Sequence, residues 1–422
     1  MNDSDEQTLD KARIGLVGLG GYSAEVLKLL REAEASEDGL TRLTDVFVPD
    51  PQNHEATLAE LGDAGCVVHE SFDALLASEA EAVWLPVPIH LHRPMTEATL
   101  AAGKTVMLEK PVAGCIDDHD ALMRAEAASE AAVLIGFQDV YRPISSSLKA
   151  RLLAGEFGTP THATVLGLWP RPQSYYDRNN WAGAMRRDGT WVLDSPLNNA
   201  MAHYVNIALF LLGPAQETAA AISHVTADLL RARHDIENFD TCSLRAGLKR
   251  GNNELSLVVN YSHAIDTNIQ PHITIDTDRG VLEFAFNGAA TFTPNQGDMT
   301  NLNPDENRNP RPPMAKALAR AVRGQPQTGA TATLANARAH TLLVSAVSQA
   351  AEIVDIPAEQ VTAHQQDDRV FLRVTRLAEY LREATGARKT LAELGTDLPS
   401  RPGSLDGLEN YTHFAGPKNG RV

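Results

Sequence analysis

The chain has 422 residues, enough for two domains that each bury a core. Its formal net charge of −17 argues against a nucleic acid or an anionic membrane as partner, because both bind basic surfaces. We see no apolar stretch of signal-peptide or membrane-spanning type. The three cysteines, Cys66, Cys115 and Cys242, show neither zinc-site nor disulfide spacing, so we expect reduced thiols, no metal site and a cytoplasmic protein.

A glycine turn follows the first apolar strand. Residues 1–12 read as a disordered lead, and residues 13–17 as a strand that runs into Gly18-x-Gly20-x-x-Ser23 and then into a helix. The first glycine permits a tight turn, and the second lets the backbone approach a pyrophosphate. The third position only packs helix on strand, so a small serine fits. We expect Gly18, Gly20, Gly21, Tyr22 and Ser23 to contact a dinucleotide; the alternative is a plain glycine turn.

The second strand predicts a ribose contact. An acid often follows this strand about 20 residues or more after the glycines, where it binds the ribose hydroxyls. Asp50 is the nearest candidate, although it lies two places late, and no arginine beside it could hold a 2′-phosphate. NAD is therefore favoured over NADP, with an ordinary turn aspartate as the alternative.

Strand and helix patterns alternate as far as residue 140, which predicts a doubly wound parallel sheet. Its buried strands are near-continuous apolar runs. The expected strands are 13–17, 45–48, 66–68, 82–88, 106–108 and 132–137, with helices near 24–33, 71–76, 89–101 and 117–130.

The run Val106 to Pro111 ends abruptly in Glu109, Lys110 and Pro111. Ligands bind open α/β sheets at the carboxyl ends of the strands, so Lys110 could deliver charge or a proton to a bound molecule. The alternative is a surface Glu–Lys pair followed by a loop proline.

A loop between residues 169 and 181 gathers rings and hydrogen-bonding side chains. Aromatic rings stack on sugar faces, and arginine and asparagine bind hydroxyls, so this loop suits a polyhydroxylated ligand. The alternative is a structural loop anchored by its tryptophans. The candidate substrate contacts are Gln138, Trp169, Arg171, Tyr176, Asn180, Trp181, Asn199 and His203.

Asn199 and His203 are four residues apart and would share one face of a helix that ends before Gly213. The histidine could exchange a proton near neutral pH. The alternative is a buried structural histidine. Asp194 lies five residues before Asn199, which points it elsewhere on a helix or into the preceding loop.

Alternating patterns at 239–248, 254–261, 269–277 and 280–286 predict an open, mostly antiparallel sheet. Such a sheet needs its exposed face covered, often by a partner subunit. Residues 287–312 read as an irregular loop, followed by helices at 313–323 and 331–352 and one from Asp368 to Ala384. We divide the chain into a lead (1–12), a nucleotide domain (13–140), an α+β substrate domain (141–355) and a C-terminal extension of unknown role (356–422).

Taken together, these motifs resemble the Gfo/Idh/MocA oxidoreductases, the group of glucose-fructose oxidoreductase and inositol dehydrogenase. The likeness covers residues 13–355 and includes the glycine turn, Pro88 to His92, and Glu109-Lys110-Pro111. It implies a Rossmann domain followed by an α+β domain that forms a homodimer or homotetramer through its sheet. It also implies cofactor contacts from Pro88, His92, Glu109 and Lys110. Where the family has an Asp four residues before its His, counting back from Gly213 places Asn199 and His203.

The resemblance implies an NAD(P)-dependent enzyme that moves a hydride between nicotinamide and a secondary hydroxyl or carbonyl of a sugar or polyol. Lys110 and His203 would act on the reacting oxygen, with Asn199 orienting it. One alternative is a glycoside hydrolase or lyase that works through a transient keto-sugar without net redox change. Another is a non-catalytic sensor that binds a sugar and the nucleotide.

Overall fold

The computed structural model describes residues 11–36, 39–303 and 309–418. Its first half forms a six-stranded parallel sheet in the order β3-β2-β1-β4-β5-β6, the strand order of dinucleotide-binding folds. The central strands β4 and β5 are wholly buried, as their apolar runs predict. The strands are β1 Ala12–Val17, β2 Thr41–Phe47, β3 Val67–His69, β4 Ala82–Leu85, β5 Thr105–Leu108 and β6 Val133–Ile135.

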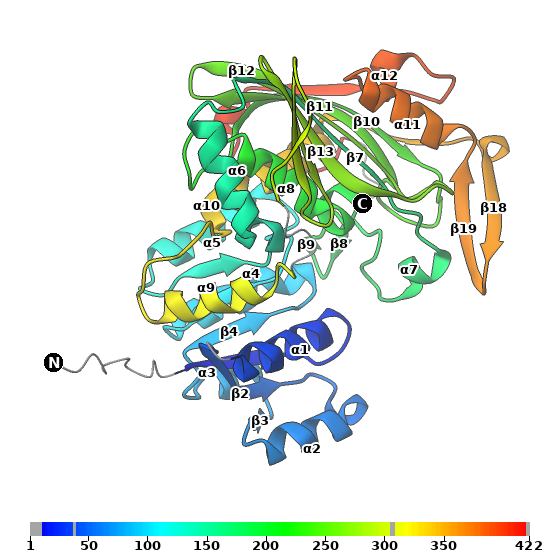
Figure 1. Cartoon of the computed structure of the whole chain (residues 1–422). Helices are drawn as coiled ribbons and strands as arrows, with labels where there is room; N and C mark the ends of the chain where they lie inside the picture. The colour runs from blue at the N-terminus through cyan, green and yellow to red at the C-terminus, as the bar shows by residue number, and fades with distance from the viewer. Residues whose placement is uncertain (1–10, 37–38, 304–308, 419–422) are drawn as a thin grey trace.

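Helices connect these strands and cover the sheet (Figure 1). Ser71 begins α3 as predicted, because its hydroxyl accepts a hydrogen bond from the Ala74 N–H at 3.1 Å. The helices are α1 Tyr22–Ala35, α2 Glu55–Asp63, α3 Phe72–Leu76, α4 Ile89–Ala101 and α5 Ile116–Ala127, with a short 3-10 turn, η1, at Pro51–Asn53.

The second half forms a ten-stranded sheet in the order β16-β15-β14-β13-β7-β12-β11-β10-β17, with β20 also paired to β10. Only the β7–β12 and β10–β17 pairs are parallel, so the sheet is mostly antiparallel as expected. The strands are β7 Pro160–Leu168, β10 Ala221–Arg231, β11 Thr241–Arg250, β12 Asn253–Ser262, β13 Ile269–Thr277, β14 Gly280–Ala285, β15 Ala290–Pro294, β16 Thr300–Asn301, β17 Ile353–Asp355 and β20 Gly403–Asp406. The predicted fold class, a Rossmann domain followed by an α+β domain, is confirmed.

Four helices lie between or beside the two sheets: α6 Pro143–Leu153, α8 Ala202–Leu211, α9 Pro312–Val322 and α10 Leu334–Ala350. In Figure 1, α6, α8 and α10 line the face of the large sheet that is turned toward the first sheet. Helix α10 joins the halves through buried polar contacts. The hydroxyl of Thr341 lies 2.8 Å from His119 Nδ1, and Ser345 accepts a hydrogen bond from the Ile116 N–H. Such satisfied buried contacts fix the relative position of the sheets.

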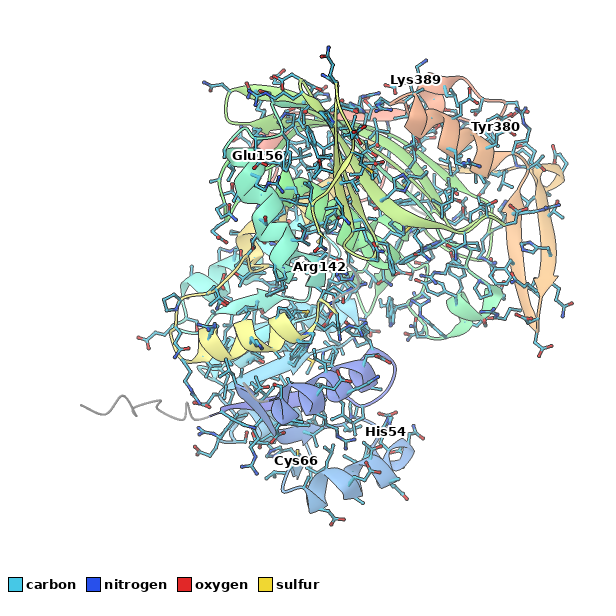
Figure 2. All side chains as sticks on the ribbon, in the orientation of Figure 1. His54, Cys66, Arg142, Glu156, Tyr380 and Lys389 are labelled. Atoms are coloured by element: carbon cyan, nitrogen blue, oxygen red, sulfur yellow. The ribbon has the colours of Figure 1, made fainter. Side chains whose placement is uncertain are left out.

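The other face of the large sheet is partly covered by the chain's own extension. Helices α11 Leu377–Gly386 and α12 Leu391–Leu394 pack there around Leu166, Leu168 and Leu230, and the hairpin β18 Val361–Gln366 and β19 Arg369–Val374 projects beside them (Figure 1). Tyr380 and Lys389 mark this side in Figure 2. The sheet face that the sequence suggested a partner would cover is thus partly buried within the subunit.

Two sequence predictions of local structure are wrong. The helix expected from Asp368 to Ala384 is a strand followed by a shorter helix, because Asp367 and Arg376 adopt left-handed backbone conformations that interrupt it. Residues 369–374 include two valines and a phenylalanine, and β-branched and aromatic side chains suit a strand. The loop expected at 287–312 contains β15 and β16, although residues 304–308 and the predicted lead 1–10 lie outside the described residues.

Among the residues that the structure describes, no helix combines the length and apolar character needed to cross a membrane.

We predict that the extension stabilises the whole second half of the chain. Leu381 of α11 is fully buried, so Leu381→Ala should lower the free energy of unfolding by about 2–5 kcal/mol through lost burial and a cavity. Val370, 45% exposed on the hairpin, is the control, and Val370→Ala should have little effect. Denaturant unfolding followed by circular dichroism measures both; equal stability of the two variants would contradict the prediction.

Candidate active site

The glycine turn joins β1 to α1 as the sequence predicts. Gly18 and Gly21 have φ angles of 81° and 55°, in the region that favours glycine. Ser23 occupies the third glycine position, and its hydroxyl donates to the backbone oxygens of Val17 at 3.4 Å and Pro86 at 3.2 Å. A small polar residue there ties α1 to the ends of β1 and β4. Helix α1 has no side-chain N-cap, which leaves its N-terminus suited to a diphosphate.

Asp50 lies just beyond β2, with its carboxylate half exposed. It accepts a hydrogen bond from Asn53 at 3.0 Å, and His54 Nε2 is 3.8 Å away. The ring of His54, labelled in Figure 2, also lies 3.6 Å from where a Cβ on Gly20 would sit. Asp50 and His54 therefore border the glycine turn. This is the position at which a dinucleotide presents its adenosine ribose.

His92 has a structural environment. Its ring is buried, with Nε2 2.9 Å from the Val87 carbonyl oxygen and Nδ1 3.2 Å from that of Val112. Burial lowers the pKa of His92, so the ring is neutral. The neutral ring donates its single N–H to one of these carbonyl oxygens, and His92 lies between the loops that follow β4 and β5. In the segment from Pro88 to His92, Pro88 lies nearest the end of β4 and immediately precedes α4.

Glu109 is buried at the end of β5, and burial raises the pKa of its carboxyl group above the usual range. Trp84 donates its indole N–H to Glu109 Oε1 at 3.1 Å. A Cβ on Gly136 would come within 2.5 Å of the same carboxylate, so glycine is required at the end of β6 to make room for it. The buried carboxylate of Glu109 therefore packs between Trp84 of β4 and Gly136 at the end of β6.

Lys110 follows at a cis peptide bond to Pro111. Its ammonium donates to two oxygens of Asn199, the backbone carbonyl at 2.9 Å and the side-chain Oδ1 at 3.1 Å. The Asn199 amide in turn donates from Nδ2 to Asp194 Oδ1 at 2.7 Å. Asp194 is buried, and its other oxygen accepts the Gly183 N–H at 2.6 Å. A continuous hydrogen-bonded chain thus runs from Lys110 through Asn199 to Asp194.

Burial lowers the pKa of Lys110 to about 8, and the charges of Arg171 and Arg178 act in the same direction. The negative charges of Glu109 and Asp194 oppose that shift. Lys110 is therefore poised to change its charge slightly above neutral pH, whereas an exposed lysine would stay protonated there.

The expected helix face shared by Asn199 and His203 is wrong. Asn199 belongs to a π-helical turn, Pro196–Ala200, and Met201 separates that turn from α8, which carries His203. The two side chains therefore do not share a regular helix face. Asp194 lies in the loop before this turn, one of the two positions that we expected, and it is hydrogen-bonded to Asn199 because Ser195 caps the turn and bends the chain back. An acid is thus present behind Lys110.

His203 lies beside a second acid, Asp139, with 3.8 Å between His203 Nδ1 and Asp139 Oδ2. Neither of these buried atoms has a hydrogen-bond partner. Asp139 Oδ1 accepts a hydrogen bond from Arg142 Nε at 2.6 Å, and Figure 2 places Arg142 between the two sheets. Burial lowers the pKa of His203 far below its usual value, helped by the charge of Lys110, so the resting imidazole is neutral. A neutral imidazole can accept a proton, and Asp139 would stabilise the cation that forms.

Arg311, at the start of α9, reaches across from the second half of the chain. Its Nε lies 3.3 Å from Gln138 Oε1 and its NH1 3.5 Å from Glu25 Oε2. The guanidinium carbon is 5.5 Å from the centroid of the Tyr22 ring. Arg311 therefore adds a positive charge beside the glycine turn and could help hold a dinucleotide there, with Gln138 as its neighbour.

The loop from Trp169 to Trp181 extends from β7 and includes the short helix α7 Gln173–Asp177. Trp169 donates its indole N–H to Gln270 and packs against Tyr204, and Tyr176 is buried with Arg233 4.8 Å from its ring centroid. Asn180 is exposed, and its backbone carbonyl accepts a hydrogen bond from Arg187. Trp169 and Tyr176 thus also serve as structural anchors of the loop.

Sequence reasoning missed Asp139, Arg142 and Arg311, and it did not predict the hydrogen bond between Asp194 and Asn199. Asp139 and Arg142 follow β6 directly, so the strand-end rule applied to Lys110 could have singled them out. Arg311 carried no local signal, because only the tertiary fold brings it to the turn. The described ranges contain no group of His, Cys, Asp or Glu that could hold a metal ion.

Comparison with known proteins agrees with this geometry. Residues 12–137 match the model of the oxidoreductase family with an NAD-binding Rossmann fold. The matched segment is the Rossmann domain that contains β1 to β6, and this domain resembles that of the Gfo/Idh/MocA family. Residues 12–137 therefore have the sequence pattern and the fold of an NAD-binding Rossmann domain.

Curated relatives resemble only part of the chain. A dTDP-3,4-didehydro-2,6-dideoxy-alpha-D-glucose 3-reductase of Streptomyces violaceoruber is 33% identical over 113 residues, 26% of this chain and 31% of that protein. Inositol 2-dehydrogenase 4 of Saccharopolyspora erythraea is 31% identical over 150 residues, 35% of this chain and 43% of that protein. The matched part thus spans less than half the length of these two relatives.

The fold extends further than the sequence likeness. The WlbA dehydrogenase of Chromobacterium violaceum, solved with NADH and UDP-GlcNAcA, superposes with a TM-score of 0.64 at 22% identity. The superposition covers 80% of this chain and 92% of that one, so both domains share the architecture.

We predict that Asp194 sets the charge of Lys110. Asp194→Asn removes a negative charge while it keeps a similar shape, so the pKa of Lys110 should fall further below its ordinary value. NMR titration of reductively ¹³C-methylated lysines, with Lys110→Arg used to assign the resonance, measures the shift. Asp235→Asn, whose carboxylate accepts a hydrogen bond from Gln173, is the matched control. An unchanged Lys110 titration in Asp194→Asn would contradict the prediction.

Proposed function

We propose that this protein is an NAD(P)-dependent oxidoreductase that interconverts a secondary hydroxyl and a carbonyl of a sugar or polyol derivative. The observation that carries the proposal is the hydrogen-bonded chain from Lys110 through Asn199 to Asp194, at the carboxyl edge of a nucleotide-binding sheet and beside His203. The relatives named above act on a deoxysugar and on inositol, which supports a substrate of this class.

The roles follow from the geometry. Two of the three ammonium donors of Lys110 are directed at Asn199, which fixes the side chain and leaves a third N–H for a substrate oxygen. Its positive charge would stabilise negative charge on that oxygen. The neutral His203 would accept the hydroxyl proton during oxidation and return it during reduction, with Asp139 stabilising the protonated ring. The nicotinamide of the bound cofactor supplies or accepts the hydride.

We also propose that NAD is preferred over NADP. In the described part of the chain, the carboxylate of Asp50 forms no ion pair with a lysine or arginine, and its charged neighbour is His54. A carboxylate without a strong counter-ion would bind ribose hydroxyls and repel a 2′-phosphate.

We still propose a homo-oligomer that forms through the large sheet, but we restrict the part of the sheet that a partner subunit would contact. Helices α11 and α12 occupy the outer face over β7 and β12, where Asn260 donates to Thr385 at 2.9 Å. A partner subunit would therefore contact the sheet toward β13 and β14, where residues such as Glu283 are exposed.

The alternative of keto-sugar hydrolysis or elimination was motivated by Asn199 in place of an acid. Asp194 supplies that acid through Asn199, so the reason to expect altered chemistry is weaker. Product analysis separates the two: net reduction of the cofactor supports the dehydrogenase, and cleavage without net reduction supports the alternative.

The first functional prediction concerns Lys110. Lys110→Ala should lower kcat by about 100-fold to 10,000-fold, because the charge on the reacting oxygen is lost. NADH affinity, measured by cofactor fluorescence, should change much less, since the diphosphate site lies at the glycine turn. Turnover within about threefold of the unmodified protein would remove Lys110 from the mechanism.

The second functional prediction concerns the dependence of kcat/KM on pH. In the direction of carbonyl reduction, kcat/KM should stay level between about pH 6 and 7 and fall as Lys110 loses its proton, near its pKa of about 8. His203, whose pKa is depressed by burial, is neutral across this range and should add no limb near pH 6.5. Initial rates in constant-ionic-strength buffers test this. A profile governed by a group of pKa near 6.5 would contradict the assignment.

A further inference from the structure

Two arginines of the Trp169–Trp181 loop lie against one tyrosine ring. The guanidinium carbon of Arg178 lies 3.6 Å from the centroid of Tyr175, and that of Arg171 lies 4.7 Å from it. Each also lies over a tryptophan, Arg171 at 5.2 Å from Trp169 and Arg178 at 5.3 Å from Trp181. These contacts and a hydrogen bond from Arg178 to the Tyr175 carbonyl oxygen hold the guanidinium groups in place, and their other N–H groups can still bind a ligand.

Among the described residues, no ion pair involves Arg171 or Arg178, whereas the nearby Arg233 pairs with Asp235 at 3.7 Å. The Nε atom of Arg171 is buried without any hydrogen-bond partner. Such an unsatisfied buried donor calls for an explanation, and an absent ligand provides one.

Both arginines lie close to the proposed reaction centre. Their charges lower the pKa of Lys110, and that of Arg178 also lowers the pKa of Asp194, which burial raises. Both further lower the pKa of His263, whose Nδ1 lies 2.7 Å from the Trp169 carbonyl oxygen and whose Nε2 is buried without a partner. The carboxylate of Asp194 is already engaged by Asn199 and Gly183, so it leaves the arginines unpaired.

Three cations therefore converge in a protein of net charge −17. The overall field of such a protein repels anions, so a local group of unpaired cations at the site is a specific feature. A neutral sugar gains little from it, since hydroxyl groups need donors and acceptors but no net charge. A carboxylate or phosphate matches the fork of an arginine in both shape and charge.

We infer that the substrate of this site is an acidic sugar or polyol, whose carboxylate or phosphate is bound by Arg171 and Arg178 while the reacting carbon lies at Lys110. This inference rests on the proposed function for the position of the reacting carbon. The anion binding itself does not depend on turnover. A carboxylate and a phosphate both present at least two negatively charged oxygens, so either group could bind the two arginines.

The test compares neutral and acidic probes on the full-length protein saturated with NAD⁺. Isothermal titration calorimetry measures the binding of D-glucose, D-glucuronate and D-glucose 6-phosphate, and cofactor reduction is followed in parallel. Arg171→Gln and Arg178→Gln remove the charges. Arg186→Gln is the matched control, because Arg186 also lies over an indole, 3.8 Å from the centroid of Trp191, but is outside the Trp169–Trp181 loop. Thermal unfolding checks that each variant is folded.

We expect at least one of the acids to bind about tenfold or more tightly than glucose, and that preference to be lost in Arg171→Gln and Arg178→Gln but kept in Arg186→Gln. The acid that binds distinguishes a carboxylate from a phosphate. Equal binding of glucose and both acids, binding of neither acid, or an unchanged preference in both loop variants would overturn the inference. Acid-selective binding without any cofactor reduction would support the inference and count against the proposed oxidoreductase.

Discussion

The site depends on how a lysine charge is held inside the protein. Lys110 stands at the end of a fully buried strand, and an ammonium in such a place is costly unless oxygens surround it. Asn199 offsets this cost, because it accepts two hydrogen bonds from Lys110 and donates one to the carboxylate of Asp194. The result is a cation that is fixed in position yet titrates near the pH at which enzymes work.

That requirement explains much of the surrounding architecture. The π-helical turn exists between Ser195 and Met201 because Asn199 must face Lys110 with both of its oxygens while its amide reaches back to Asp194. On the nucleotide side, Gly136 leaves space for Glu109, and Trp84 satisfies one oxygen of that carboxylate. Helix α10 fixes the position of one sheet relative to the other. Lys110 and Asn199, which lie about 90 positions apart in the sequence, can therefore meet.

Sequence patterns predicted the parts of the fold that local chemistry determines. The glycine turn, the buried parallel strands and the Glu109-Lys110-Pro111 strand end each carry their signal within a few residues, and the structure places the turn and the strand end at the carboxyl edge of the parallel sheet. A helix was predicted in the extension because residues 369–374 mix arginines with apolar side chains, a pattern that fits either a helix or a strand. The left-handed residues Asp367 and Arg376 lie on either side of this segment, which forms a strand. The hydrogen bond between Asp194 and Asn199 was missed since a regular helix was assumed where the chain makes a π turn. Asp139 meets Arg142 locally, but tertiary packing brings Asp139 to His203 and Arg311 to Gln138.

The central claim is that Asp194 acts on Lys110 through Asn199. A double-mutant cycle tests it most directly: kcat/KM for cofactor-dependent turnover is measured for Asp194→Asn, Asn199→Ala and the double variant. If the three residues form one chain, the second change should add little to the first, with a coupling energy of about 1 kcal/mol or more. Strictly additive losses would show that Asp194 and Asn199 act independently, and would contradict the account.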